Sequence, residues 1–262
     1  GTDGQVVHSL AKWKRLALKR YEFKLGTGLY TDMNAIRRDE VVDNLHSIYV
    51  DQWDWEKHID PQNRNVLYLK DTVREIVGCI CDTATALRNA FPVLTFRPDR
   101  DVYFITTQEL EDRFPNLTPN ERELEICRLH HTVFLMQIGK TLKSGSKHDG
   151  RAPDYDDWDL NGDILMWNPV LGRNFEVSSM GIRVDAAALD RQLEESGCNQ
   201  RRNLPFHQML LHGELPQSIG GGIGQSRLCM LLLGTCHIGE VQVSLWDQET
   251  LRACEKAGIT LL

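Results

Sequence analysis

The clearest pattern of apolar positions runs from residue 71 to residue 91 and stops before Pro92. Its apolar positions are Val73, Ile76, Val77, Ile80, Ala84 and Leu87. Residues three and four apart lie on one side of a helix, so this stretch predicts an amphipathic helix with one buried face. Weaker helical patterns span 6–25, 118–131, 185–196, 204–212, 225–233 and 248–256. In the first of these, Leu10, Trp13 and Ala17 form the expected apolar face.

Local signals support several of these helix starts. Thr106 and Glu109 have the spacing of a capping box, and so do Thr118 and Glu121. Asp185 is a favourable N-cap residue for the helix that follows it. These signals predict three helices with well-defined first turns.

Strict alternation predicts a strand over 45–55, with Gln52 and Asp54 on one face and Trp53 and Trp55 on the other. Apolar runs predict further strands over 102–106, 132–138 and 241–245, whereas 26–32 is rich in turn-forming residues. Residues 163–168 and 175–182 predict an antiparallel hairpin. Antiparallel strands mixed with helices predict an α+β fold, in which helices flank an antiparallel sheet. We expect a single domain over residues 1–262.

Residues 218–227 read Ser-Ile-Gly-Gly-Gly-Ile-Gly-Gln-Ser-Arg and precede an apolar helical run. Glycines at 220, 222 and 224 let a ligand approach the backbone, and Arg227 can hold a phosphate or stack on a base. A dinucleotide fingerprint would need glycine at Gln225 or Arg227, and a P-loop would need it at Phe134. The pattern resembles the ATP-binding third motif of class II aminoacyl-tRNA synthetases. A flexible turn before a core helix is the alternative.

Composition narrows the classes of protein. The chain has 262 residues, of which 41% are hydrophobic and 26% charged, and its net charge is −7. This acidic balance disfavours a nucleic-acid partner, and no apolar run has the length of a membrane span. Seven scattered cysteines favour reduced thiols in a reducing compartment. We therefore expect a cytoplasmic protein with neither a nucleic acid nor a membrane as its partner.

Asp163 and Glu176 stand in the two arms of the predicted hairpin. If the hairpin is symmetric about 171–172, Glu176 lies opposite Trp167, and Asp163 shares its face. The carboxylates are then four residues apart, roughly 13 Å along a strand, unless a bulge or twist closes the gap. Two carboxylates and phosphate oxygens can hold a hydrated Mg²⁺, so the hairpin is a candidate metal site.

Other polar residues allow both a chemical and a structural interpretation. Arg183 shares a strand face with Ser179, where it can clamp a carboxylate, but the same pattern fits an edge strand with polar surface residues. The acids at 154–157 fit an ammonium or ribose site, or a solvated turn. Arg37 fits a triphosphate clamp or a solvated loop. Lys14 taken alone fits a surface lysine whose stem packs on a helix.

Six longer segments carry a closer resemblance. They are 7–15 (Val-His-Ser-Leu-Ala-Lys-Trp-Lys-Arg), 49–55 (Tyr-Val-Asp-Gln-Trp-Asp-Trp), 151–158 (Arg-Ala-Pro-Asp-Tyr-Asp-Asp-Trp), 160–165 (Leu-Asn-Gly-Asp-Ile-Leu), 175–185 (Phe-Glu-Val-Ser-Ser-Met-Gly-Ile-Arg-Val-Asp) and 216–227 (Pro-Gln-Ser-Ile-Gly-Gly-Gly-Ile-Gly-Gln-Ser-Arg). From about residue 6 to its end, the chain resembles the ammonia-dependent aspartate–ammonia ligases, the A-type asparagine synthetases. That family is similar to the catalytic domain of aspartyl-tRNA synthetase and is normally a homodimer.

The resemblance implies a reaction and a set of site residues. Aspartate and MgATP would give β-aspartyl-adenylate and pyrophosphate, and ammonia would then give asparagine and AMP. The residues implied for aspartate are Ser9, Lys14, Gln52, Asp54, Ser179, Arg183 and Gly222. Those implied for ATP or AMP are Arg37, Asp156, Glu176, Gly224 and Arg227, with Asp163 and Glu176 for Mg²⁺. The catalytic residues implied are Arg37, Lys14 and Gln52.

Two departures from the family pattern bear on the site. The chain begins at Gly1, so we expect the family's N-terminal segment, with its dimer motif and an acid near the reacting centre, to be missing. The link from Trp158 to Leu160 is shorter than is common in the family, either through residues omitted from the numbering or through a true deletion.

Two other functions compete with the ligase. One is a relative of aspartyl-tRNA synthetase that charges tRNA, which the acidic balance and the lack of a nucleic-acid module oppose. The other is an inactive synthetase-like interaction protein. Arg37, Asp163, Glu176 and Arg227 are all present, which opposes that second alternative.

Overall fold

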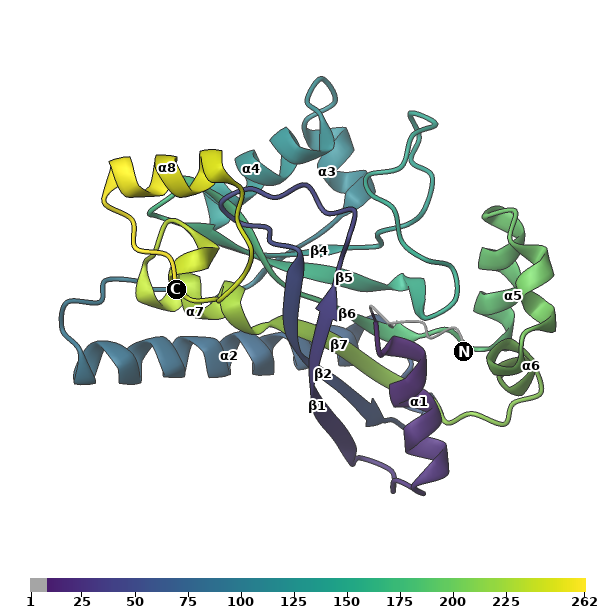
Figure 1. Cartoon of the computed structure of the whole chain (residues 1–262). Coiled ribbons are helices and arrows are strands. Elements are labelled where there is room, and N and C mark those ends of the chain that lie inside the picture. The colour runs from purple at the N-terminus through teal and green to yellow at the C-terminus, as the bar shows by residue number, and fades with distance from the viewer. Residues whose placement is uncertain (1–8) are drawn as a thin grey trace.

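The computed structural model describes residues 9–262, and within them the strands form one seven-stranded sheet in the order β1-β2-β7-β6-β5-β4-β3 (Figure 1). The strands are β1 (Gly28–Ile36), β2 (Tyr49–His58), β3 (Tyr103–Thr106), β4 (Thr132–Met136), β5 (Asp156–Asn168), β6 (Arg173–Arg183) and β7 (Ser218–Gly224). The helices are α1 (Ala11–Arg20), α2 (Val66–Ala90), α3 (Thr107–Arg113), α4 (Pro119–His130), α5 (Ala186–Glu195), α6 (Pro205–Leu211), α7 (Gln225–Leu233) and α8 (Gln248–Ala257).

Neighbouring strands run antiparallel, except that β3 and β4 are parallel. Helices α3 and α4 lie between these two strands in the sequence. They form the crossover that a parallel pair needs, so that β4 begins at the same end of the sheet as β3. The predicted α+β class is confirmed. The sheet is mixed at this edge rather than antiparallel throughout.

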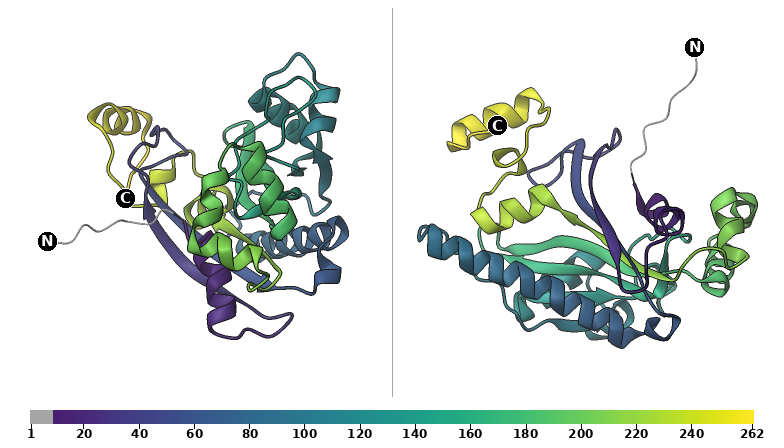
Figure 2. Two further views of the ribbon diagram at one scale, coloured as in Figure 1. Left: turned by 90° about the vertical axis from the view of Figure 1, so that its right-hand side faces the viewer. Right: turned by 90° about the horizontal axis from the view of Figure 1, so that it is seen from below.

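Helix α2 covers one face of the sheet and ends before Pro92, as its apolar pattern predicts (Figure 2). Its buried side chains meet strand residues that include Ile164, Met180 and Ile219 in one hydrophobic cluster. The α2 members of that cluster are Leu69, Val73, Val77, Ile80, Cys81 and Ala84. Within residues 9–262 no helix, α2 included, is long and apolar enough to cross a membrane.

The opposite face of the sheet carries the alternate strand residues. Near β3, Val133, Leu135 and Leu165 are buried in a second cluster with apolar residues of α3 and α4. Asp163 shares the face of Leu165, and its register partner in β6 is Ser179. The central part of this face is therefore polar, and the candidate site lies there.

Helix α1 lies beside β2 and β7, and its buried face includes Ala17 of the predicted face but not Trp13. Lys14, Arg15, Ala17 and Leu18 are buried, whereas Trp13 is 45% exposed. The cations on the buried face have acidic or carbonyl partners, which offset the cost of removing them from water. The part of the predicted helix before residue 9 lies outside the described residues.

Capping signals place helix starts where the sequence predicts them. Thr106 and Glu109 bond reciprocally at the start of α3, and Thr118 and Glu121 do so at the start of α4. Asp185 accepts a hydrogen bond from a backbone N–H in the first turn of α5. The helices predicted over 204–212, 225–233 and 248–256 are confirmed as α6, α7 and α8.

Three stretches differ from the sequence prediction. The predicted turn at 26–32 contains the start of β1, whose residues pair along β2 from Gly28 to Ile36. Within the described residues, 241–245 belongs to no strand, and Val243 and Leu245 are 71% and 76% exposed. The glycine run at 218–224 is a strand between β2 and β6 rather than a flexible turn.

The β5–β6 hairpin contains a bulge that changes its register. Trp167 pairs with Asn174, and Glu176 pairs with Leu165, so the predicted pairing of Glu176 with Trp167 is wrong. The pairing slips by one residue at Val177, between Ile164 and Leu165 on β5. Leu165 and Asp163 are two positions apart on β5, so Glu176 lies on the face of Asp163, as predicted. The turn between Asn168 and Arg173 sets this register, which shortens the expected separation from four positions along β5 to two.

Candidate active site

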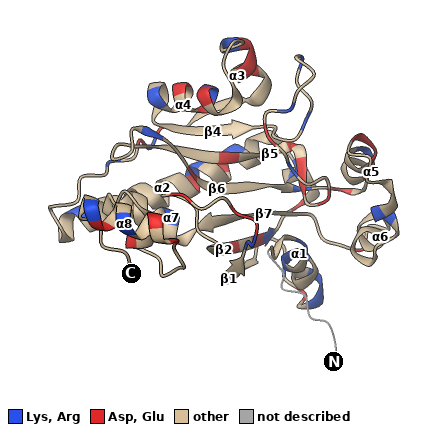
Figure 3. Ribbon diagram, turned by 45° about the horizontal axis from the view of Figure 1, so that its top comes forward, with Lys and Arg blue, Asp and Glu red and all other residues tan. Residues whose placement is uncertain are grey.

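A cavity of about 380 Å³ opens on the sheet face opposite α2. Charged residues lie on the central strands as well as on the outer helices (Figure 3). The predicted site residues that line the cavity are Ser9, Lys14, Arg37, Gln52, Asp54, Asp156, Glu176, Ser179, Arg183, Gly222, Gly224 and Arg227. Asp163 is bonded to Arg151, which lines the cavity too.

Four strands contribute one residue each to a row across the sheet. Asp163 of β5 pairs with Ser179 of β6, which pairs with Gly222 of β7, and Gly222 pairs with Asp54 of β2. Residues in register on neighbouring strands project to the same face. Strand pairing therefore brings together side chains that lie more than a hundred residues apart in the sequence.

Gly220, Gly222 and Gly224 alternate along β7 on this face, and we call them the glycine floor. A Cβ atom at Gly222 would lie 2.7 Å from Gln52 Oε1 and 3.0 Å from Asp54 Oδ1. A Cβ at Gly220 would clash with polar atoms of its neighbours as well. Gly220 and Gly222 are therefore required, because atoms of β2 and β6 already occupy the space above them, whereas a Cβ at Gly224 would come no closer than 3.2 Å to Arg227 Cβ.

Lys14 extends from α1 to the floor of the cavity with its side chain only 1% exposed. Its Nζ donates to Asp54 Oδ1 at 2.8 Å and to the carbonyl oxygen of Gly221 at 3.0 Å. Burial, followed by the positive charge of Arg183, holds the pKa of Lys14 below its ordinary value of 10.5. The interpretation of Lys14 as a surface lysine is wrong, since this ammonium group is inside the site.

Arg183 ends β6 with its guanidinium held by two buried acids. Its Nη2 donates to Glu56 Oε2 at 2.7 Å, Nε donates to both Glu56 oxygens, and Nη1 donates to Asp156. Ser218 Oγ donates to Glu56 Oε1 at 2.6 Å. Burial alone would raise the pKa of Glu56, but the Arg183 guanidinium holds it below its usual value. Glu56 thus stays charged and fixes the arginine.

Sequence reasoning missed Glu56, although a signal for it exists. It follows Asp54 by two positions on a strand, so it shares the face of Gln52 and Asp54. Asp156 was predicted to contact the adenylate, and here its carboxylate is directed to Arg183 at the aspartate half of the cavity. Its role toward the nucleotide stays a prediction.

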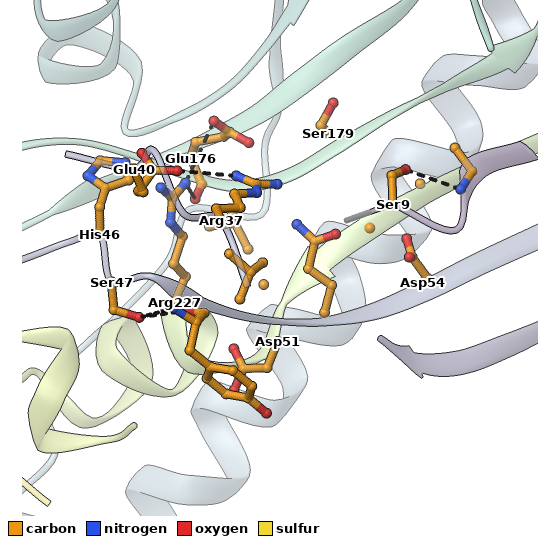
Figure 4. Close-up of a pocket in the computed structure, with 18 of the residues that line it drawn as sticks. Ser9, Arg37, Glu40, His46, Ser47, Asp51, Asp54, Glu176, Ser179 and Arg227 are labelled. Atoms are coloured by element: carbon orange, nitrogen blue, oxygen red, sulfur yellow. Dashed lines mark hydrogen bonds and ion pairs between the residues drawn. The ribbon is translucent and has the colours of Figure 1, made fainter. Parts of the chain in front are cut away.

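Arg37 and Arg227 lie together with Glu176 on one side of the cavity, while Ser9, Asp54 and Ser179 lie toward the other side (Figure 4). Arg227 Nη1 is 3.7 Å from Glu176 Oε2, and Arg37 Nη1 is 3.8 Å from Glu40 Oε2. Both arginines are partly exposed, and neither contact is a tight ion pair. Two cations with loosely held partners suit the phosphates of a nucleotide.

Asp163 is buried beside Arg151, whose Nη2 donates to its Oδ1 at 2.6 Å. Burial raises the pKa of Asp163 to about 7, because it outweighs the attraction of Arg151, and the charge of Glu176 adds to the rise. Burial disfavours the ionised form of this carboxyl group, and a cation bound beside it would stabilise that form. Arg151 also donates from Nη1 to Ser179 Oγ at 2.7 Å, so it links two predicted site residues.

Asp163 and Glu176 have the chemistry of a magnesium site. They share a face, and Mg²⁺ prefers one or two carboxylates that it combines with phosphate oxygens and water. Across residues 9–262 no group of three or more His, Cys, Asp or Glu side chains forms a metal site of its own. A cation here would therefore bind together with a nucleotide.

A buried cluster around Asp154 joins α1 to the edge of the site. Asp154 Oδ2 accepts from Lys12 of α1 at 2.9 Å, from Arg201 of the 3₁₀ helix η2 (Asn199–Asn203) at 3.0 Å, and its distance to His207 Nε2 of α6 is 3.0 Å. Asp154 and His207 are almost fully buried. Asp154 lies two residues before Asp156, the first residue of β5, so the cluster links the start of β5 to α1, which carries Lys14.

Comparison with solved structures identifies the class of fold. An asparaginyl-tRNA synthetase from Entamoeba histolytica, solved with asparaginyl-adenylate, superposes with a TM-score of 0.64 at 16% sequence identity. The match covers 90% of this chain and 55% of that chain. The protein has the fold of class II aminoacyl-tRNA synthetase catalytic domains, as predicted.

Comparison of sequences identifies the family. The family model described as Aspartate-ammonia ligase matches residues 1–258. The aspartate–ammonia ligase of Clostridium tetani is 60% identical over 98% of this chain and 76% of its own length. That of Lactobacillus johnsonii is 60% identical over 98% of this chain and 77% of its own length. The chain belongs to the aspartate–ammonia ligase family.

Proposed function

We propose that the protein converts L-aspartate and ammonia to L-asparagine at the expense of ATP. Its membership of the aspartate–ammonia ligase family supports this function. The observation that carries the proposal is a single cavity lined by four cations: Arg37 and Arg227 lie on one side (Figure 4), and Lys14, which is bonded to Asp54, and Arg183 line the rest. One side suits phosphates and the other suits the carboxylates of an amino acid.

The proposed reaction has two steps. A β-carboxylate oxygen of aspartate attacks the α-phosphorus of ATP, and pyrophosphate leaves. The nitrogen of ammonia then attacks the activated carbonyl carbon, loses a proton, and expels AMP. Arg37 beside the α-phosphate would stabilise the negative charge that develops there.

The chain's own residues would orient the amino acid. Lys14 and Arg183 attract its carboxylates, while Gln52 and Asp54 accept hydrogen bonds from its ammonium group. Ser9 and Ser179 lie at the edges of the same half-site, and Gly222 leaves room above the backbone. Holding both reactants in one geometry removes much of the entropic barrier to their reaction.

Arg227, Glu176, Gly224 and Asp156 are proposed to contact the nucleotide. Mg²⁺ held by Asp163 and Glu176 would neutralise phosphate charge when bound. Gly224 is the N-cap residue of α7, so the nucleotide would lie close to the start of this helix. Arg227 in the first turn of α7 then reaches the same ligand.

We further propose a homodimer in the cytoplasm. The dimer follows from the family resemblance. All seven cysteines are free, and Cys81, Cys127 and Cys254 are buried, which suits a reducing compartment.

The purified full-length protein should form asparagine and AMP in equal amounts from aspartate, ammonium and MgATP, measured by mass spectrometry. Omission of any one substrate should abolish both products. Arg227→Ala should raise the KM for ATP more than the KM for aspartate. A wild-type protein that makes no asparagine under these conditions would contradict the proposed function.

A further inference from the structure

The cations predicted to bind aspartate already have acidic partners. Lys14 is paired with Asp54 at 2.8 Å, and Arg183 is held by both Glu56 and Asp156. These five groups carry two positive and three negative charges. All are buried, so water screens them little. A substrate that brings two carboxylates needs a further cation in this half of the cavity.

Arg151 is a cation in the right place. It lies in the loop before β5, lines the cavity, and its side chain is 10% exposed. Its Nη1 donates to Ser179 Oγ at the aspartate half, and its Nη2 donates to Asp163 Oδ1 at the candidate metal site. Its Nε is buried and has no hydrogen-bond partner among residues 9–262. The guanidinium therefore spans both half-sites with part of its donor capacity unused.

Asp163 is the acid that holds Arg151, and it also belongs to the candidate metal site. The acids paired with Lys14 and Arg183 lie outside that metal site. A dication beside Asp163 would compete with Arg151 for its negative charge. A buried guanidinium that loses its counter-ion gains strongly from a new anion nearby.

We propose that Arg151 is a further aspartate-binding residue, and that binding of the metal–nucleotide at Asp163 frees it to hold a substrate carboxylate. The inference rests on the proposed function, because it assumes that aspartate and MgATP are the ligands. Aspartate and the metal–nucleotide would then bind cooperatively. By thermodynamic linkage, aspartate must then tighten nucleotide binding by the same factor.

The test measures aspartate binding by isothermal titration calorimetry, without and with Mg²⁺ and α,β-methylene-ATP, which cannot react. Wild type should bind aspartate at least about fivefold tighter with the nucleotide, the lower end of usual coupling between sites. Arg151→Met should bind aspartate more weakly and lose this gain. Arg128→Met is the matched control, since Arg128 is exposed and pairs with Glu125 on α4; its binding should equal that of wild type.

Arg151→Lys keeps the charge but has no planar fork to bridge Ser179 and Asp163. It should retain part of the aspartate affinity and lose most of the coupling, and it decides the question if Arg151→Met does not fold. Wild type that makes asparagine but shows no coupling would overturn the role of Arg151 and leave the ligase intact. If Arg151→Lys keeps the full gain in aspartate affinity on nucleotide binding, the proposed role of Arg151 is likewise overturned and the ligase function stands. Wild type that binds no aspartate would overturn both proposals.

Discussion

At the scale of single residues, the glycines of β7 have two different tasks. Gly222 and Gly224 line the cavity, where an added Cβ at Gly222 meets the ends of the Gln52 and Asp54 side chains. Gly221 faces the other way, where an added Cβ would lie 2.6 Å from Met180 Cβ and 2.8 Å from the Ser179 carbonyl oxygen. At Gly222 the obstructing atoms are side-chain ends that can move, whereas at Gly221 backbone atoms block the added methyl group.

Gly222→Ala and Gly221→Ala should therefore separate binding from stability. Gly222→Ala should weaken aspartate binding by tenfold or more while the melting temperature stays close to wild type, because its methyl group fills space above the backbone and displaces the flexible end of Gln52. Gly221→Ala should cost about 1–3 kcal/mol of unfolding free energy, as overpacking of a core does. Calorimetry and thermal unfolding measure the two effects. Equal melting temperatures for the two variants would contradict this division.

The residues of the site could be predicted only in part. Side chains on β2 alternate between the two faces of the sheet. Glu56 could have been predicted by continuing this alternation two residues beyond Asp54. Arg151 could not, because its position in a loop has no period and its partners Ser179 and Asp163 lie on two later strands. Charge pairs between distant segments depend on strand register, which a single sequence does not reveal.

At the scale of elements, α1 is held in place by the cluster around Asp154. Burial lowers the pKa of His207, while its hydrogen-bonded cations hold the pKa of Asp154 below its usual value despite its burial. The unfolded chain therefore takes up a proton at His207 before the folded protein does. Stability should fall as the pH drops below about 6.5, the ordinary pKa of histidine, and fall again as Asp154 is protonated.

His207→Gln should reduce the pH dependence of unfolding below about pH 6.5, where a single histidine contributes up to about 1.4 kcal/mol per pH unit. Glutamine can still donate to Asp154 but does not titrate. Urea unfolding at several pH values measures the slope. The control is His212→Gln at the C-terminal end of α6, where the histidine is not buried. If His207→Gln leaves the change of unfolding free energy with pH as it is in wild type, His207 is not the source of the pH dependence.

Strands were harder to predict than helices for a physical reason. Caps such as Thr106 and Thr118 act within four residues, so the local sequence specifies them. The strands β1 and β7 depend on hydrogen bonds from β2 and β6, which are distant in sequence. β7 contains four glycines, which disfavour a strand on their own and are accepted because its neighbours pair on both sides.

At the scale of the whole molecule, the two faces of the sheet divide stability from chemistry. The face under α2 carries a hydrophobic cluster, and the other face carries the cavity. The α+β class could be predicted because the helical and strand periods are clear in the sequence. The parallel β3–β4 pair could not, because nothing in either strand encodes the direction of its partner.

Leu69→Ala on α2 should cost about 2–5 kcal/mol of unfolding free energy, because Leu69 is 1% exposed within the cluster. Its aspartate affinity should equal that of wild type, since α2 lies across the sheet from the cavity. Leu67→Ala on the same helix is the control, because Leu67 is 67% exposed and should change stability by less than about 0.5 kcal/mol. Denaturant unfolding and calorimetry check both statements. Loss of affinity in a folded Leu69→Ala protein would show that the faces are coupled.

The glycine floor also limits how this pocket can change in evolution or by design. Glycine is the smallest residue, so every substitution at Gly220, Gly222 or Gly224 adds bulk and none removes it. The depth of the pocket is already at its maximum, and mutation can only make it shallower. A larger substrate can therefore be accommodated only through the walls, at residues such as Gln52 or Ser179. Selection for a wider specificity should leave the floor unchanged and act on the side chains around it.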